Sequence, residues 1–89
     1  MSHSINYLEF SLRKQPKTIL KECKRIADVN GDYKGQIENI RFNGYSIMKN
    51  RDEAEKWIKD NDSGWYDNLA IRFKDNDKVK WLVKIEYHC

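Results

Sequence analysis

The strongest constraint on the fold is the regular alternation of apolar and polar residues in the last quarter of the chain. Residues 69–74 read Leu-Ala-Ile-Arg-Phe-Lys, and residues 79–87 read Val-Lys-Trp-Leu-Val-Lys-Ile-Glu-Tyr. Successive side chains of a β-strand point to opposite faces, so the pattern predicts two strands, each with one buried and one wet face. We expect the rest of the chain to pair with these strands or to cover them.

The loop between the two strands decides which side chains share a face. The apolar rows of both strands face the same way only if the loop has an odd number of residues. We therefore predict a three-residue loop at 75–77, which pairs Phe73 with Val79. This register places a mostly basic row on one solvent-exposed face, made of Arg72, Lys74, Lys78, Lys80, Leu82, Lys84 and Glu86.

Two helices are predicted from apolar stripes. Residues 16–30 begin with Pro16, which suits a first helical turn because its missing N–H has no partner there. Residues 51–60 have acidic residues in the first turn, as the helix dipole prefers, and Asn50 or Asp52 is the expected cap. The stripe of the first helix consists of Ile19, Leu20, Cys23, Ile26 and Ala27.

Two other segments are assigned on local signals. Residues 4–14 fit both a strand and a helix, and we favour a short helix that leads into Pro16. Residues 36–48 contain Asn43-Gly44, the pair typical of a type I′ turn, which predicts a hairpin.

Together these segments predict a single α+β domain over residues 1–89. The expected architecture is an antiparallel sheet of about four strands in two hairpins, with two or three helices packed on one face. A chain of 89 residues has room for one hydrophobic core.

Charge and cysteine content indicate where such a chain works. The net charge is +3, with basic residues concentrated in 1–25 and 72–84 and acidic residues in 51–68. The two cysteines do not form a secreted disulfide framework, and we see neither a signal peptide nor an apolar run of about 18 residues. We therefore expect a cytoplasmic protein of a bacterial cell that does not bind membranes.

Motifs for metal, cofactor or catalytic chemistry are weak. Residues 28–32, Asp-Val-Asn-Gly-Asp, resemble the start of an EF-hand or dockerin calcium loop, but Tyr33, Gly35 and Asn39 do not fit the later positions. We expect a helix end and a polar turn there. The histidines and cysteines lack metal-ligand spacing. The sequence thus predicts no cofactor, no metal site, no catalytic residues and no enzyme activity.

Binding residues are predicted on surfaces. Trp65 either plugs the end of the core or joins Tyr66 in an aromatic hot spot. The predicted partner-binding set is Trp65, Tyr66, Arg72, Lys74, Lys80 and Lys84. The alternative is a sequence-tolerant nucleic-acid-binding set, made of Lys17, Lys21, Lys24, Arg72, Lys74, Lys80 and Lys84.

Residues 51–89 also carry a resemblance. Arg-Asp-Glu-Ala-Glu-Lys-Trp-Ile at 51–58, the run from Gly64 to Lys74 and the run from Trp81 to Cys89 resemble small uncharacterised proteins encoded by phages and mobile elements of Gram-positive bacteria. The resemblance implies a context in which small domains without catalytic residues bind host proteins, including defence nucleases. We therefore expect a non-enzymatic interaction module that binds a host protein or a protein–nucleic-acid complex, with inhibition of a host defence system as one form of this role.

Overall fold

The computed structural model describes residues 3–33, 35–64 and 66–89, which form a sheet and two helices. The elements, in chain order, are β1 (His3–Ser11), α1 (Pro16–Asn30), β2 (Arg41–Met48), α2 (Arg51–Asn61), β3 (Leu69–Asp75) and β4 (Lys78–His88). The α+β class and both predicted helices are confirmed. Neither helix in the described part of the chain is long and apolar enough to cross a membrane.

The sheet is mixed, with strand order β1-β4-β3-β2. β4 pairs antiparallel with β1 and with β3, whereas β2 runs parallel to β3. The prediction of two antiparallel hairpins is therefore wrong. Residues 36–48 do not form a hairpin because neither Asn43 nor Gly44 has the positive φ of a type I′ turn. The predicted N-terminal helix is also wrong, since His3–Ser11 pairs with β4 along its whole length.

The β3–β4 hairpin has a two-residue turn, so the predicted three-residue loop is wrong. Asp75 pairs with Lys78, and Asn76 between them takes the left-handed conformation with φ 56°. Every later pair is shifted by one residue relative to the predicted register. Ile71 lies opposite Leu82, and Arg72 lies opposite Trp81.

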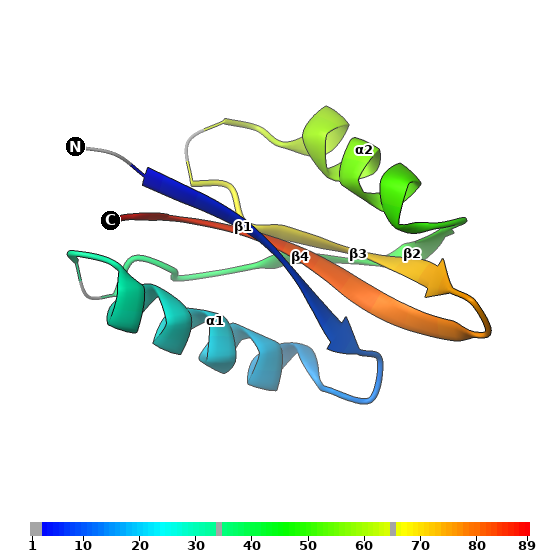
Figure 1. Cartoon of the computed structure of the whole chain (residues 1–89), viewed down its shortest axis with the longest axis horizontal. Helices are drawn as coiled ribbons and strands as arrows, with labels where there is room; N and C mark the ends of the chain where they lie inside the picture. Colours follow the sequence, from blue (N-terminus) through cyan, green and yellow to red (C-terminus); the bar gives the residue numbers. More distant parts are fainter. Residues whose placement is uncertain (1–2, 34, 65) are drawn as a thin grey trace.

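The helices cover opposite faces of the sheet, as Figure 1 shows, so the prediction that they share one face is wrong. The core accordingly consists of two clusters. The α1 face buries Phe10, Ile19, Cys23, Ala27, Ile37, Ile40, Ala70, Trp81, Val83, Ile85 and Tyr87. The α2 face buries Ala54, Ile58, Leu69, Ile71, Phe73 and Leu82.

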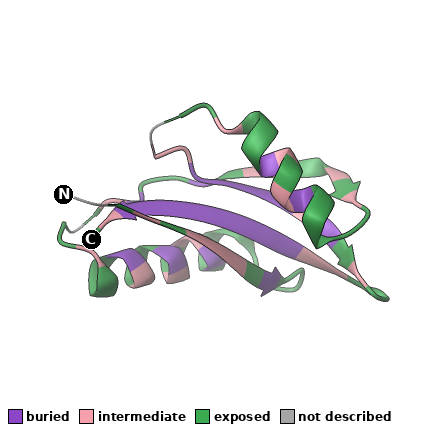
Figure 2. Cartoon of the chain, turned by 45° about the horizontal axis from the view of Figure 1, so that its top comes forward, coloured by how far each residue is buried: buried purple, intermediate pink, exposed green. Residues whose placement is uncertain are grey.

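β4 is buried on both faces because it lies between two strands and has a helix on each side (Figure 2). All residues from Trp81 to Tyr87 are buried, including Lys84 and Glu86. A one-residue shift of register usually exposes an apolar row. Here it does not, since both rows of β4 have a hydrophobic layer to enter.

Candidate interaction surfaces

The predicted basic row is divided between the two faces of the sheet. Residues directly opposite in an antiparallel pair point to the same face. Arg72 lies opposite Trp81, and Lys74 opposite Val79, so both are on the α1 face. Lys80 and Lys84 alternate with Trp81 and are on the α2 face. The prediction that these four cations share one solvent-exposed face is wrong, whereas their part in partner binding stays a prediction.

Lys84 is a buried cation that is held by protein groups. Its Nζ lies 2.8 Å from Asp62 Oδ2 and 3.2 Å from Glu86 Oε1, and it donates to the Asp67 carbonyl at 2.6 Å. Burial works to lower the pKa of Lys84, but the hydrogen bonds to Asp62 and Glu86 outweigh it, and the pKa is raised. Lys84 therefore stabilises the α2–β3 connection and is not available at the surface.

Two other predicted cations also have internal partners. Lys80 Nζ lies 2.6 Å from Asp75 Oδ2 and 3.4 Å from Glu9 Oε1. Arg72 Nη2 donates to the Gly44 carbonyl at 2.6 Å, and its guanidinium carbon lies 6.0 Å from the centre of the Trp81 ring. Of the four sheet cations in the predicted binding sets, Lys74 is the exposed one with no ion pair in residues 3–33, 35–64 and 66–89.

Of the predicted aromatic pair, Trp65 lies outside the described residues. Tyr66 has φ 54°, an uncommon conformation for a non-glycine residue. Its hydroxyl lies 2.6 Å from His88 Nε2, and its ring packs against the His88 ring with centres 4.9 Å apart. Tyr66 is thus half-buried and docked onto β4.

A polar pocket of about 300 Å³ lies beside Tyr66 and is lined also by Gln36, Glu38 and Arg41. The Arg41 guanidinium is bound to Asp67, with Nε 2.8 Å from Oδ1 and Nη2 on Oδ2. The guanidinium charge is therefore already balanced, and the pocket offers hydrogen-bonding groups rather than a free cation. Within the described residues, no group of three or more His, Cys, Asp or Glu side chains is placed to hold a metal ion.

Acid is expected to weaken the fold through Asp67. The hydrogen bond from Arg41 holds the Asp67 pKa well below its usual range, the bonds from Ser63 add to this, and burial opposes it. The unfolded chain protonates this carboxyl near its ordinary pKa of about 4. The stabilisation that the ionised Asp67 provides through these hydrogen bonds is therefore complete above about pH 4. It is lost as the pH falls toward the pKa of Asp67 in the folded state.

Asp67→Asn should lower the free energy of unfolding by about 1–3 kcal/mol near neutral pH. The difference in the free energy of unfolding between this variant and the wild type should become smaller as the pH falls. Urea unfolding at a series of pH values measures it, with Asp77→Asn at the exposed hairpin turn as the control. A gap that stays constant down to the lowest pH would contradict this role of Asp67.

The sequence did not reveal the bulge in β2. The parallel register between β2 and β3 breaks between Asn43 and Ile47, which leaves Gly44, Tyr45 and Ser46 outside the ladder. Tyr45 is 97% exposed at this bulge. The Asn43-Gly44 pair predicts a hairpin turn, whereas the chain continues in one direction through the bulge as β2.

The three α1 lysines of the alternative nucleic-acid-binding set form a solvent-exposed row, whereas their part in binding stays a prediction. Lys17, Lys21 and Lys24 are all exposed, whereas Ile19 and Cys23 on the opposite side of the helix are fully buried. Because Lys80 and Lys84 lie on the α2 face, the helix row and the full set of sheet cations do not form one continuous surface.

Comparison of the chain with known protein families, curated proteins and solved structures found no match. The resemblance of residues 51–89 to phage and mobile-element proteins stays a prediction.

Proposed function

We propose that this chain is a non-enzymatic protein-interaction module that binds its partner through the β2 bulge, defined as residues 43–47. The observation that carries the proposal is the exposed fraction of Tyr45, 97%, on a segment whose backbone is held by other side chains. A tyrosine offers a large contact area with little side-chain entropy to lose, which is why aromatic residues are frequent hot spots at interfaces.

The backbone of the bulge is fixed by two side chains. Asn43 Oδ1 accepts hydrogen bonds from the N–H of Tyr45 at 2.8 Å and of Ser46 at 3.1 Å. From the neighbouring strand, Arg72 donates to the Gly44 carbonyl at 2.6 Å. A segment ordered before binding loses less entropy when a partner docks. Arg72 thus supports binding as a positioning residue, by holding the backbone that presents Tyr45.

The surroundings of Tyr45 suit a protein partner. Ile47 is exposed on the same strand, and Trp57 of α2 is half-buried nearby. Tyr45 and Trp57 line a shallow pocket of about 280 Å³ together with Arg41 and Asn61. An apolar centre with polar groups around it is the usual composition of a protein interface. The bulge also interrupts the free edge of β2, which favours recognition through side chains over the addition of a strand.

The kind of partner follows from the resemblance noted for residues 51–89. We place it among the proteins of a bacterial host cell, where the module would act in the cytoplasm. Inhibition of a host defence system is the specific form of this hypothesis. The identity of the partner decides between inhibition and another regulatory role.

A photo-crosslinking amino acid at position 45 is expected to capture this partner in cells. The same amino acid at Val29, an exposed apolar position at the end of α1, should not capture it. With the partner identified, Tyr45→Ala should weaken binding about 30-fold, the effect of losing about 2 kcal/mol at a hot spot. Isothermal titration calorimetry measures this change.

The stability of the Tyr45→Ala variant should stay within about 0.5 kcal/mol of the wild type, because the side chain makes few contacts. Arg72→Ala should weaken binding while Tyr45 remains in place. A partner captured equally from positions 45 and 29, or bound with unchanged affinity by Tyr45→Ala, would contradict the proposal.

A further inference from the structure

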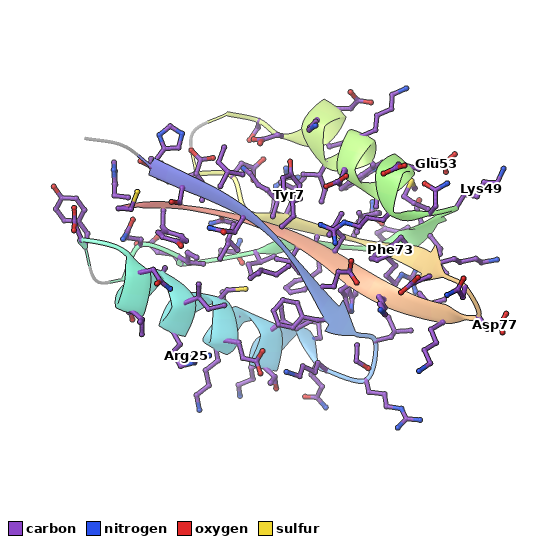
Figure 3. All side chains as sticks on the ribbon, viewed as in Figure 1. Tyr7, Arg25, Lys49, Glu53, Phe73 and Asp77 are labelled. Atoms are coloured by element: carbon purple, nitrogen blue, oxygen red, sulfur yellow. The ribbon has the colours of Figure 1, made fainter. Side chains whose placement is uncertain are left out.

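The outer side of α1 carries a concentration of positive charge. Residues 13–25 contain a single acid, Glu22, whose Oε1 lies 2.6 Å from Lys14 Nζ. The cations of this stretch are all exposed and are Arg13, Lys14, Lys17, Lys21, Lys24 and Arg25. Figure 3 shows Arg25 extending from α1 on the side away from the sheet.

The charge of the central row is not used inside the molecule. Within the described residues, Lys17, Lys21 and Lys24 form no ion pair, in contrast to Lys80 and Lys84. The row is held in place because the opposite side of α1 is buried in the core. At 1.5 Å per residue, the three lysines extend over about 10 Å along the helix.

From this arrangement we infer that the α1 face, defined as residues 13–25, binds the sugar–phosphate backbone of duplex DNA without reading its sequence. Exposed cations that lack internal partners are the groups that displace counterions from phosphates. The cations on one side of α1 form a fixed row, which suits the regular phosphate array of a duplex. This inference is independent of the β2 bulge and of its protein partner.

Other polyanionic partners fit the α1 face less well. No large apolar side chain is exposed from residue 13 to residue 28 of the described chain. The face therefore lacks both the anchor of a protein hot spot and the aromatic platforms that stack single-stranded bases. The apolar side of α1 is buried against β4 and is not available for insertion into a lipid bilayer.

The DNA-binding surface differs from the one predicted from sequence. Lys84 is buried, Lys80 is paired with Asp75, and Arg72 holds the β2 bulge. Lys74 is exposed on the α1 side of the sheet and is the one predicted sheet cation that can extend the surface.

The test is fluorescence anisotropy with a labelled duplex of random sequence, about 25 base pairs long. If roughly five cations contact phosphates, the plot of log affinity against log salt should have a slope near −4.5. Lys17→Gln/Lys21→Gln/Lys24→Gln should reduce the steepness of that slope by about 2.7 and weaken binding at low salt by at least about tenfold.

The matched control is Lys49→Gln/Lys56→Gln/Lys59→Gln, which removes the same charge from exposed positions in and beside α2. It should keep most of the wild-type affinity and slope. Equal losses in the two variants would assign binding to net charge and overturn the inference. Absence of duplex binding at low salt would also overturn it, as would tighter binding to anionic vesicles or to single-stranded DNA. Both variants should melt within a few degrees of the wild type, because all six lysines are exposed.

Discussion

Lys84→Met is expected to lower the free energy of unfolding by about 3–5 kcal/mol, since it leaves the buried Glu86 carboxylate and the half-buried Asp62 carboxylate without their cation. Asp62 and Glu86 both bind Lys84 Nζ, and the Glu86 side chain is only 8% exposed. A domain of this size has roughly 4–13 kcal/mol of total stability, so the variant should be close to unfolded at physiological temperature. Urea denaturation followed by tryptophan fluorescence measures the loss.

The control for Lys84→Met is Lys78→Met, which removes a lysine from the exposed end of the same strand. It should change stability by less than about 0.5 kcal/mol. Adding Asp62→Asn and Glu86→Gln to Lys84→Met should restore part of the loss by removing the unpaired charges. An unchanged stability for Lys84→Met would show that Lys84 is exposed to solvent, as the sequence-based register predicted.

Leu82→Ala is expected to lower the free energy of unfolding by about 2–5 kcal/mol. Leu82 is fully buried on the α2 face, in a cluster with Ile58, Ile71 and Phe73. Truncation removes apolar contacts and leaves a cavity that a central strand cannot easily close. Thermal and urea unfolding both report the change.

The stability of Leu82→Ala also distinguishes between the two possible registers of the β3–β4 hairpin. The three-residue loop places Leu82 on the wet face, where truncation would cost little, whereas the two-residue turn places it in the core. Leu12→Ala is the matched control because Leu12 is 44% exposed, and it should cost less than about 0.5 kcal/mol. Losses of similar size in the two variants would contradict the burial of Leu82.

Local signals predicted α1 and α2 well, although they also favoured a helix at residues 4–14, where the structure has β1. Pro16, the apolar stripe of α1 and the Asn50 cap each depend on neighbours within one or two turns. In the structure, Asn50 Oδ1 accepts a hydrogen bond from the Glu53 N–H at 2.9 Å, as a helix cap requires. Where the interactions that form an element are local, its boundaries can be read from the sequence.

The alternation of apolar and polar residues could not give the register of the β3–β4 hairpin, because that argument assumes that each strand has only one buried face. β4 has two buried faces, and its charged residues Lys84 and Glu86 are buried because each forms an ion pair. Lys84 and Glu86 look like surface residues until Asp62, which follows α2, is brought beside them. Leu82, an apolar residue in the polar row, was a local sign that both faces are covered.

The two candidate binding surfaces, the α1 face and the β2 bulge, also differ in how far local sequence patterns predict them. The lysines of α1 were found because helical spacing places them on one side. Tyr45 was missed because the bulge depends on Arg72, which lies 28 positions away in sequence from Gly44. The Asn-Gly pair predicts a turn, whereas the chain keeps its direction and pairs in parallel with β3 on both sides of the bulge. Long-range contacts of this kind leave no periodic pattern in a single sequence.

The central position of β4 has a consequence for biosynthesis. β4 joins β1 to β3, and its pairing with β1 places His3 beside His88. On the ribosome, both antiparallel ladders must wait until β4 has emerged, because β4 is one partner in each. Pairing between such distant segments is slow, and unpaired strands are exposed to aggregation while they wait. The sheet therefore closes only after β4 has been made, and the apolar sides of α1 and α2 gain their β4 contacts only then.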